Sequence, residues 1–171
     1  MKIYLDTSSL FKLYKRETGS EEMEAEISNN NIADVFLSEI TKLEFLSSVY
    51  KRVRMKDLSV KEAKQIIDLF EYDFRKYLIV PFDNAILNTA EKLISIYGVT
   101  GLRTLDSIQL ASAIEVKEKI DKYFTSDKLL RFLFYWLNTA SFSGFFTLCG
   151  EGWRWYFFEF LDQLFLHAWA S

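Results

Sequence analysis

The stretch KIYLDTSSLFKLY, residues 2–14, joins a short β-prone run to an acidic residue and then to a helix-forming segment. Its first four residues predict a strand, and Asp6 follows the end of that strand directly. Thr7 or Ser8 is expected to cap a helix over roughly residues 9–15. A strand that leads straight into a helix is typical of an α/β fold, so this stretch decides the fold class.

The same alternation continues along the chain. Further strands are predicted at residues 34–37, 77–80 and 122–125, and further helices over 20–27, from Ser38 to about 53, from Ser59 to about 70, over 83–97, over 104–114 and after Asp127. The pattern predicts an α/β fold with three layers, in which a mostly parallel sheet of about four to five strands is flanked by helices.

Length and composition exclude several kinds of site. The 171 residues fit one domain that can bury a core without disulfides. Cys149 is the only cysteine and His167 the only histidine, so an intramolecular disulfide and a zinc site with several histidines or cysteines are impossible. The net charge of −3 argues against a generally basic surface, although it allows a local basic strip. The single cysteine and the lack of an N-terminal signal peptide predict a cytoplasmic protein.

Four acidic residues stand at or near the boundaries of the apolar segments: Asp6, Glu44, Asp106 and Asp127. In parallel sheets, ligands bind beyond the carboxyl ends of the strands, so these carboxylates could meet at one rim of the sheet. Clustered carboxylates repel one another and are stable together when a hard cation such as Mg²⁺ lies between them. The constellation therefore favours metal-dependent hydrolysis of a phosphodiester.

Each acid also has a purely structural interpretation. Asp6 and Asp127 could simply cap the helices that follow them. Asp106 lies in a first helical turn, where the helix dipole favours an acid. Glu44, between two apolar neighbours in an amphipathic helix, could be an ordinary solvated residue.

Basic residues follow Glu44 along the same helix and past its end. Lys51, Arg52, Arg54 and Lys56 could contact RNA phosphates, or they could form a solvated helix end that complements the dipole. Lys12, with Lys15 and Arg16, forms a second and weaker basic group.

Four segments carry a resemblance to a known family: LDTSSLFKLY, SEITKLEFLSSVYKR, LRTLDSIQLASA and FTSD. In their order and spacing, over residues 1–131, they resemble the PIN-domain ribonucleases, and the nearest group is the VapC-type toxins of toxin–antitoxin pairs. The resemblance implies an endoribonuclease that uses Mg²⁺ or Mn²⁺.

The same resemblance assigns roles to individual residues. It implies that Asp6 and Asp106 are the main metal ligands, and that Glu44 and Asp127 complete the site or orient water. The small polar residues Thr7, Ser8 and Ser126 match supporting positions near the metal.

Partners follow from the resemblance as well: an RNA substrate, a cognate antitoxin and a second copy of the chain in a homodimer. A non-catalytic RNA- or protein-binding module on the same fold is the alternative. No stable membrane insertion is expected.

The composition changes after residue 131. All four tryptophans lie in residues 132–171, and no lysine follows Lys128. We interpret this part as an atypical aromatic-rich extension of a nuclease domain at 1–131. It could be a native end, a dimer or membrane contact, or a tail that is read in a shifted frame.

Overall fold

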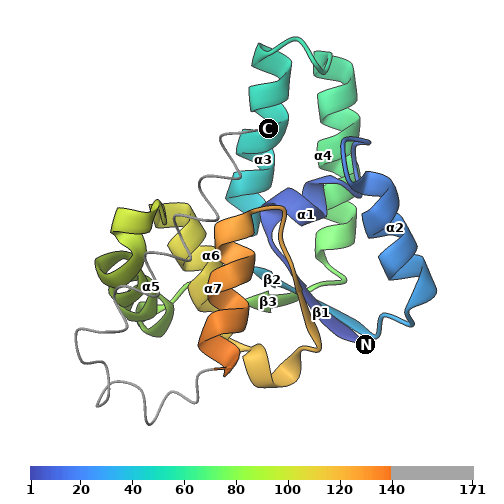
Figure 1. The fold of residues 1–171 in the computed structure, drawn as a ribbon. Coiled ribbons are helices and arrows are strands. Elements are labelled where there is room, and N and C mark those ends of the chain that lie inside the picture. The colour runs from blue at the N-terminus through green and yellow to red at the C-terminus, as the bar shows by residue number, and fades with distance from the viewer. Residues whose placement is uncertain (140–171) are drawn as a thin grey trace, which may run out of the picture. The chain divides into compact units, whose positions relative to one another are not determined.

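The order of the strands decides where a site can form. In the computed structural model, which describes residues 1–139, four strands form one sheet in the order β3-β2-β1-β4 (Figure 1). All three pairings are parallel. The strands are β1 (Lys2–Leu5), β2 (Asp34–Ser38), β3 (Leu78–Val80) and β4 (Lys122–Phe124). The expected α/β fold with a parallel sheet is confirmed, with four strands among the described residues.

Helices connect the strands at nearly all of the expected places. They are α1 (Thr7–Phe11), α2 (Ser20–Asn29), α3 (Thr41–Arg54), α4 (Val60–Phe74), α5 (Asn84–Tyr97), α6 (Thr104–Glu115) and α7 (Lys128–Thr139), with short 3₁₀ turns η1 (Gly98–Thr100) and η2 (Lys117–Lys119). A capping box starts α4, because Ser59 and Glu62 bond each other's backbone N–H groups.

Two predicted helix starts are wrong. Ser38 does not cap a helix: it is the last residue of β2, pairs with Val80 of β3, and α3 begins three residues later. The first helix begins at Thr7 rather than near residue 9, and its N-cap is Asp6. In both places pairing within the sheet determines where the strand ends, which local sequence signals do not reveal.

The two faces of the sheet pack against different helices. Ile3 and Leu5 of β1 belong to an apolar cluster with residues of α1 to α4. Tyr4, which lies between them, points to the opposite face and bonds Gln109 of α6. On that face Tyr123 of β4 packs on Phe134 of α7, with ring centroids 4.7 Å apart. The three expected layers are thus helices, sheet and helices.

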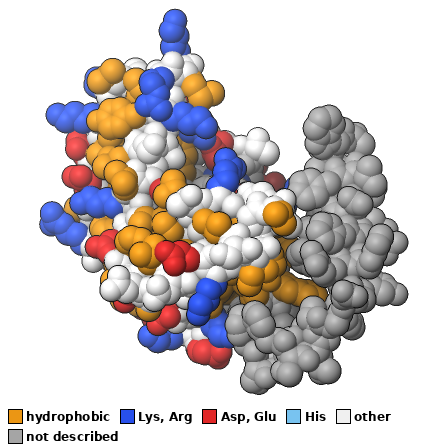
Figure 2. All heavy atoms as spheres, turned by 90° about the vertical axis from the view of Figure 1, so that its left-hand side faces the viewer, with side chains coloured by type: hydrophobic (Ala, Val, Ile, Leu, Met, Phe, Trp, Pro, Cys, Tyr) orange, Lys and Arg blue, Asp and Glu red, His pale blue; other side chains and the backbone are white. Residues whose placement is uncertain are grey.

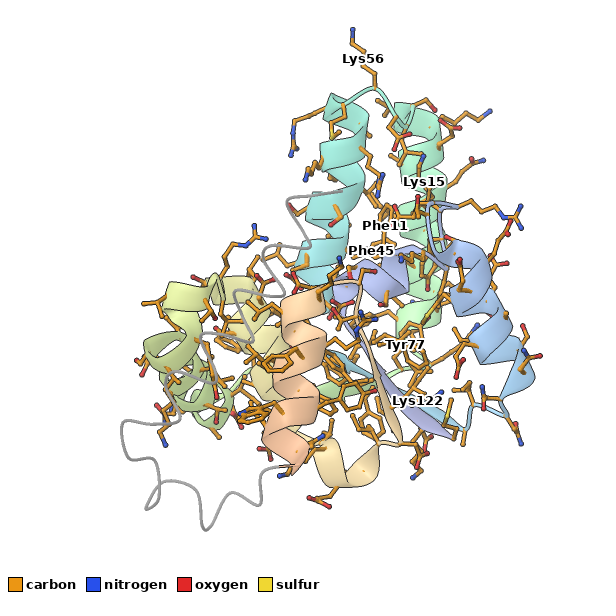
Figure 3. All side chains as sticks on the ribbon, in the orientation of Figure 1. Phe11, Lys15, Phe45, Lys56, Tyr77 and Lys122 are labelled. Carbon is orange, nitrogen blue, oxygen red and sulfur yellow. The ribbon has the colours of Figure 1, made fainter. Side chains whose placement is uncertain are left out.

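A stack of aromatic rings fixes α3 and α4 to the domain. Phe45 of α3 and Phe70 of α4 are fully buried and lie face to face, with centroids 3.9 Å apart and planes 19° apart. Phe11 of α1 packs on Phe45 at 5.3 Å. Figure 3 shows Phe11 and Phe45 turned toward each other, whereas Lys56 projects from the far end of the α3–α4 pair. This stack sets the position of α3, which carries Glu44.

The chain reverses its direction of travel across the sheet at β1. It moves from β1 outward to β2 and β3, and then crosses back to add β4 on the other side of β1. At such a switch point the two connections leave on opposite faces of the sheet, and a crevice opens between the carboxyl ends of the neighbouring strands. Asp6 follows β1 and Asp127 follows β4, so both lie at this crevice.

The predicted extension falls mostly outside the described residues. Met1–Tyr135 form one compact unit, and the boundary at residue 131 stays a prediction. Within residues 1–139 no helix is long and apolar enough to cross a membrane.

Candidate active site

Asp6 holds the ends of β1 and β4 together. Its backbone N–H donates to the Phe124 carbonyl of β4 at 3.0 Å. Its carboxylate accepts hydrogen bonds from the Thr125 hydroxyl at 2.6 Å and from the Ser8 hydroxyl at 2.8 Å. It also accepts the Ser9 N–H at 2.8 Å, which is the N-cap bond of α1. Asp6 can therefore cap α1 and belong to a site at the same time, because the same buried carboxylate accepts the Ser9 N–H and lines the pocket described below.

Glu44 is not a solvated helix residue. It lies in the first turn of α3 and is partly buried. Its Oε2 accepts a hydrogen bond from the Thr7 hydroxyl at 2.5 Å and another from the Gln109 amide. Residues from α1, α3 and α6 thus meet at one carboxylate oxygen.

Asp106 and Asp127 complete the set from two further helix starts. Asp106 lies in the first turn of α6, where Arg103 pairs with it at 3.3 Å. Asp127 accepts the Leu130 N–H at 3.0 Å and so caps the start of α7. The Ser126 N–H donates to Ser8 at 3.1 Å, which ties the loop after β4 to α1.

These carboxylates share one pocket of about 380 Å³. Its lining residues are Asp6, Thr7, Ser8, Glu44, Ser48, Asp106, Gln109, Ser126, Asp127 and Leu130. All seven residues that the sequence proposed as acids or as their small polar neighbours lie here. Sequence reasoning missed Gln109, which stands in a run that reads as apolar core, and Ser48, one helical turn after Glu44.

The basic residues do not line this pocket. Arg52 is engaged elsewhere, since it forms ion pairs with Glu17 and Asp57 and lies over the Phe11 ring at 4.7 Å. Lys51 and Arg54 are exposed on α3. Figure 2 shows lysine and arginine side chains gathered on the outer part of the molecule that α3 and α4 form.

Burial makes the carboxylates of the pocket reluctant to ionise. Desolvation raises the pKa of Asp6, although the hydrogen bonds from Thr125, Ser9 and Ser8 oppose the rise. Desolvation also raises the pKa of Glu44, and the charges of Asp6 and Asp106 add to the effect. The pKa of Asp106 is raised by burial and by the charge of Asp127. Ionising these carboxylates together is therefore costly unless a positive charge lies between them.

A divalent cation fits the chemistry of this donor set. Carboxylate oxygens are the ligands that Mg²⁺ prefers, and a cation would offset both the burial and the mutual repulsion that raise these pKa values. Among residues 1–139, no three Asp, Glu, His or Cys side chains are grouped tightly enough to form a ready-made metal site. The four carboxylates thus line a common pocket without converging on a single point.

We expect the metal-free protein to lose stability as the pH rises through the raised pKa of Glu44. Between the ordinary value of 4.5 and the raised value, the folded state holds a proton that the unfolded chain has released. The contribution of this proton to stability is fully present below pH 4.5 and is lost as the pH rises through the raised pKa of Glu44. Urea unfolding in EDTA at a series of pH values should show this fall in the wild type and a flatter profile in Glu44→Gln.

Glu62 provides the control with the opposite sign. Hydrogen bonds from Ser59 lower the pKa of this exposed acid, so its contribution is lost as the pH falls. Glu62→Gln should leave the loss at rising pH intact. If the unfolding free energies of the wild type and of Glu44→Gln changed in parallel with pH, the assignment of this pH dependence to Glu44 would be contradicted.

A sequence model of the PIN domain matches residues 3–131. Among solved structures, FitAcB from Neisseria gonorrhoeae superposes with a TM-score of 0.57 at 21% identity, covering 76% of this chain and 91% of that one. VapC20 from Mycobacterium tuberculosis, described as a toxin that cleaves the sarcin–ricin loop, gives 0.57 at 13% identity over 75% and 92% of the two chains.

VapBC-1 from nontypeable Haemophilus influenzae gives a TM-score of 0.52 at 15% identity, covering 79% of this chain and 92% of that chain. These likenesses concern the fold. No curated protein matches the chain in sequence.

Proposed function

Because the chain belongs to the PIN domain family, we propose that it is a metal-dependent endoribonuclease that hydrolyses phosphodiester bonds of RNA. The observation that carries the proposal is the pocket at the switch point between β1 and β4, which four carboxylates from four separate segments line. A non-catalytic module would have no need to hold so many repelling charges together in a partly buried pocket.

Asp6, Glu44, Asp106 and Asp127 would hold Mg²⁺ or Mn²⁺. When bound, such an ion stabilises the charge that develops on the phosphate and makes water a better nucleophile. The protein's own contribution is to fix the carboxylates in place. Thr125 and Ser8 orient Asp6, Thr7 orients Glu44, and Arg103 pairs with Asp106.

Lys51 and Arg54 are the cations best suited to bind RNA phosphates outside the pocket. Both are exposed and stand on the helix that carries Glu44. Arg52 and Lys12 were further candidates from the sequence. The ion pairs of Arg52 with Glu17 and Asp57 favour a structural role for it, and Lys12 stays a secondary proposal.

We also propose that the protein is a cytoplasmic toxin that pairs with an antitoxin and with a second copy of itself. The similar structures include ones described as a toxin–antitoxin complex from Klebsiella pneumoniae and as FitAB bound to a DNA fragment. Exposed apolar side chains on α5 and just after it, such as Ile96 and Val99, are available for such contacts. The catalytic part is assigned to residues 1–131, which contain every proposed site residue.

The function is tested by incubating the purified chain with total cellular RNA in Mg²⁺, in EDTA, and in EDTA followed by excess Mn²⁺. We expect defined fragments with Mg²⁺, none with EDTA, and their return with Mn²⁺. Cleavage that persists in EDTA would refute the metal mechanism. RNA binding without cleavage in any metal would instead identify a non-catalytic module.

A further inference from the structure

Gln109 is a buried polar residue in the middle of a buried helix. The α6 residues from Ser107 to Ala113 are all buried, and Gln109 is only 3% exposed. A buried amide without partners destabilises the fold, so its hydrogen bonds need an explanation. Apolar residues such as Leu or Met would fill the same position of α6 without that cost.

The hydrogen bonds of the amide lead into the acidic pocket. Its Nε2 donates to the hydroxyl of Thr7 at 2.9 Å, to the hydroxyl of Thr41 at 3.0 Å, and to Oε2 of Glu44. Thr7 in turn donates to the same Glu44 oxygen. An amide turned the other way would place its carbonyl oxygen against the ionised carboxylate, where neither atom has a proton to share.

Tyr4 fixes the orientation of this amide from the other side. Its hydroxyl is fully buried and donates to Oε1 of Gln109 at 2.9 Å, with the backbone carbonyl of Gln109 at 3.2 Å. Because β1 is an inner strand next to the switch point, the sheet itself determines which end of the amide faces Glu44.

We propose that Gln109 is a positioning residue, which holds the Glu44 carboxylate in the orientation that the pocket needs for a divalent cation. The proposal rests on the proposed function, and it adds a residue that bears no charge and binds neither metal nor RNA. Outer partners that orient a metal ligand typically contribute about 10- to 100-fold in metal affinity or activity. Glu44 reaches the pocket from α3, and the side chains of Thr7 and Gln109 both bond its Oε2.

Gln109→Met tests this role, because methionine keeps the length of the side chain and loses the amide. We expect Mn²⁺ affinity, measured by electron paramagnetic resonance, to fall about 10- to 100-fold. At subsaturating metal, kcat for RNA cleavage should fall while KM for RNA stays the same. The matched control is Thr100→Val, which removes a buried hydrogen bond to the Tyr97 carbonyl at a residue that does not line the pocket. It should lose stability while keeping Mn²⁺ affinity and kcat.

Tyr4→Phe provides a second test should Gln109→Met fail to fold. It removes only the hydroxyl that orients the amide, so Mn²⁺ affinity and kcat should fall by a smaller factor than in Gln109→Met. Unchanged Mn²⁺ affinity in the pocket variants, or an equal loss in Thr100→Val, would overturn the positioning role.

A crystal structure of the variant separates this inference from the function on which it rests. If the wild type binds no Mn²⁺ and cleaves no RNA, the proposed function fails. The positioning role then still predicts that the Glu44 carboxylate moves in Gln109→Met relative to the wild type. An unmoved carboxylate would refute the positioning role whatever the wild type does.

Discussion

Asp6→Asn should abolish RNA cleavage and leave the fold intact. The substitution removes a negative charge from the pocket, and a metal ion supplies several kcal/mol of transition-state stabilisation, so a loss of about 4 kcal/mol corresponds to roughly a thousand-fold in rate. Asparagine is as good an N-cap as aspartate, so the bond from the Ser9 N–H can persist. Initial rates on a defined RNA at saturating Mg²⁺ measure the loss.

The stability of this variant carries separate information. Burial raises the pKa of Asp6 because the ionised carboxylate is costly in that place, and a neutral amide avoids this cost. We expect Asp6→Asn to be as stable as the metal-free wild type or more stable. Mg²⁺ should raise the Tm of the wild type and leave that of the variant unchanged.

Asp83→Asn is the matched control for Asp6→Asn. Asp83 caps α5 through the Ile86 N–H at 3.0 Å, just as Asp6 caps α1, but it does not line the pocket. Full cleavage by Asp83→Asn and none by Asp6→Asn would separate the metal role from the cap. Comparable activity in the two variants would rule out Asp6 as a metal ligand.

Phe70→Ala should cost about 3–5 kcal/mol of the free energy of unfolding. The ring is fully buried, lies face to face with Phe45, and also contacts Tyr14 and Phe74 edge-on. Because α3 and α4 project together from the sheet (Figure 1), few other contacts can replace this stack. Urea unfolding at constant pH in EDTA measures the change.

Leu69→Ala is the control for the loss of this ring. Leu69 is the preceding residue of α4 and is 52% exposed, so its truncation should cost well under 1 kcal/mol. Equal losses in the two variants would show that the α3–α4 contact contributes little to the stability of the domain.

The sequence predicted the acids of the site better than the interactions that surround them. Asp6 and Asp127 could be placed because they follow predicted strands, and parallel strands end at the same edge of a sheet. The strand order could not be predicted, since nothing local in residues 122–125 states that β4 pairs with β1 instead of β3. Glu44 illustrates the limit: its position on a helix was foreseen, and its partial burial depends on Thr7 and Gln109, which are distant in sequence.

Gln109 and Arg52 show the same limit, because the sequence did not point to the first and suggested RNA binding for the second. Gln109 stands among apolar residues, and only the packing of α6 on β1 reveals that its amide reaches Glu44. Arg52 belongs to a basic run that suggested RNA binding, whereas its partner Glu17 lies 35 residues earlier in a connection. Tertiary partners decide the role of each side chain, and a single sequence does not contain them.

The pairing of β1 with β4 also has a consequence for the time at which activity can arise during translation. Tyr4 of β1 pairs with Tyr123 of β4. The inner strand β1 is therefore among the first segments that the ribosome makes, whereas its partner β4 is made more than a hundred residues later. At roughly 5–20 residues per second, the ribosome needs on the order of ten seconds to reach β4. Until then the Asp6 N–H lacks the Phe124 carbonyl and Asp127 does not yet exist. A nascent chain therefore has no complete pocket, and under the proposed function this interval passes before any RNA can be cleaved.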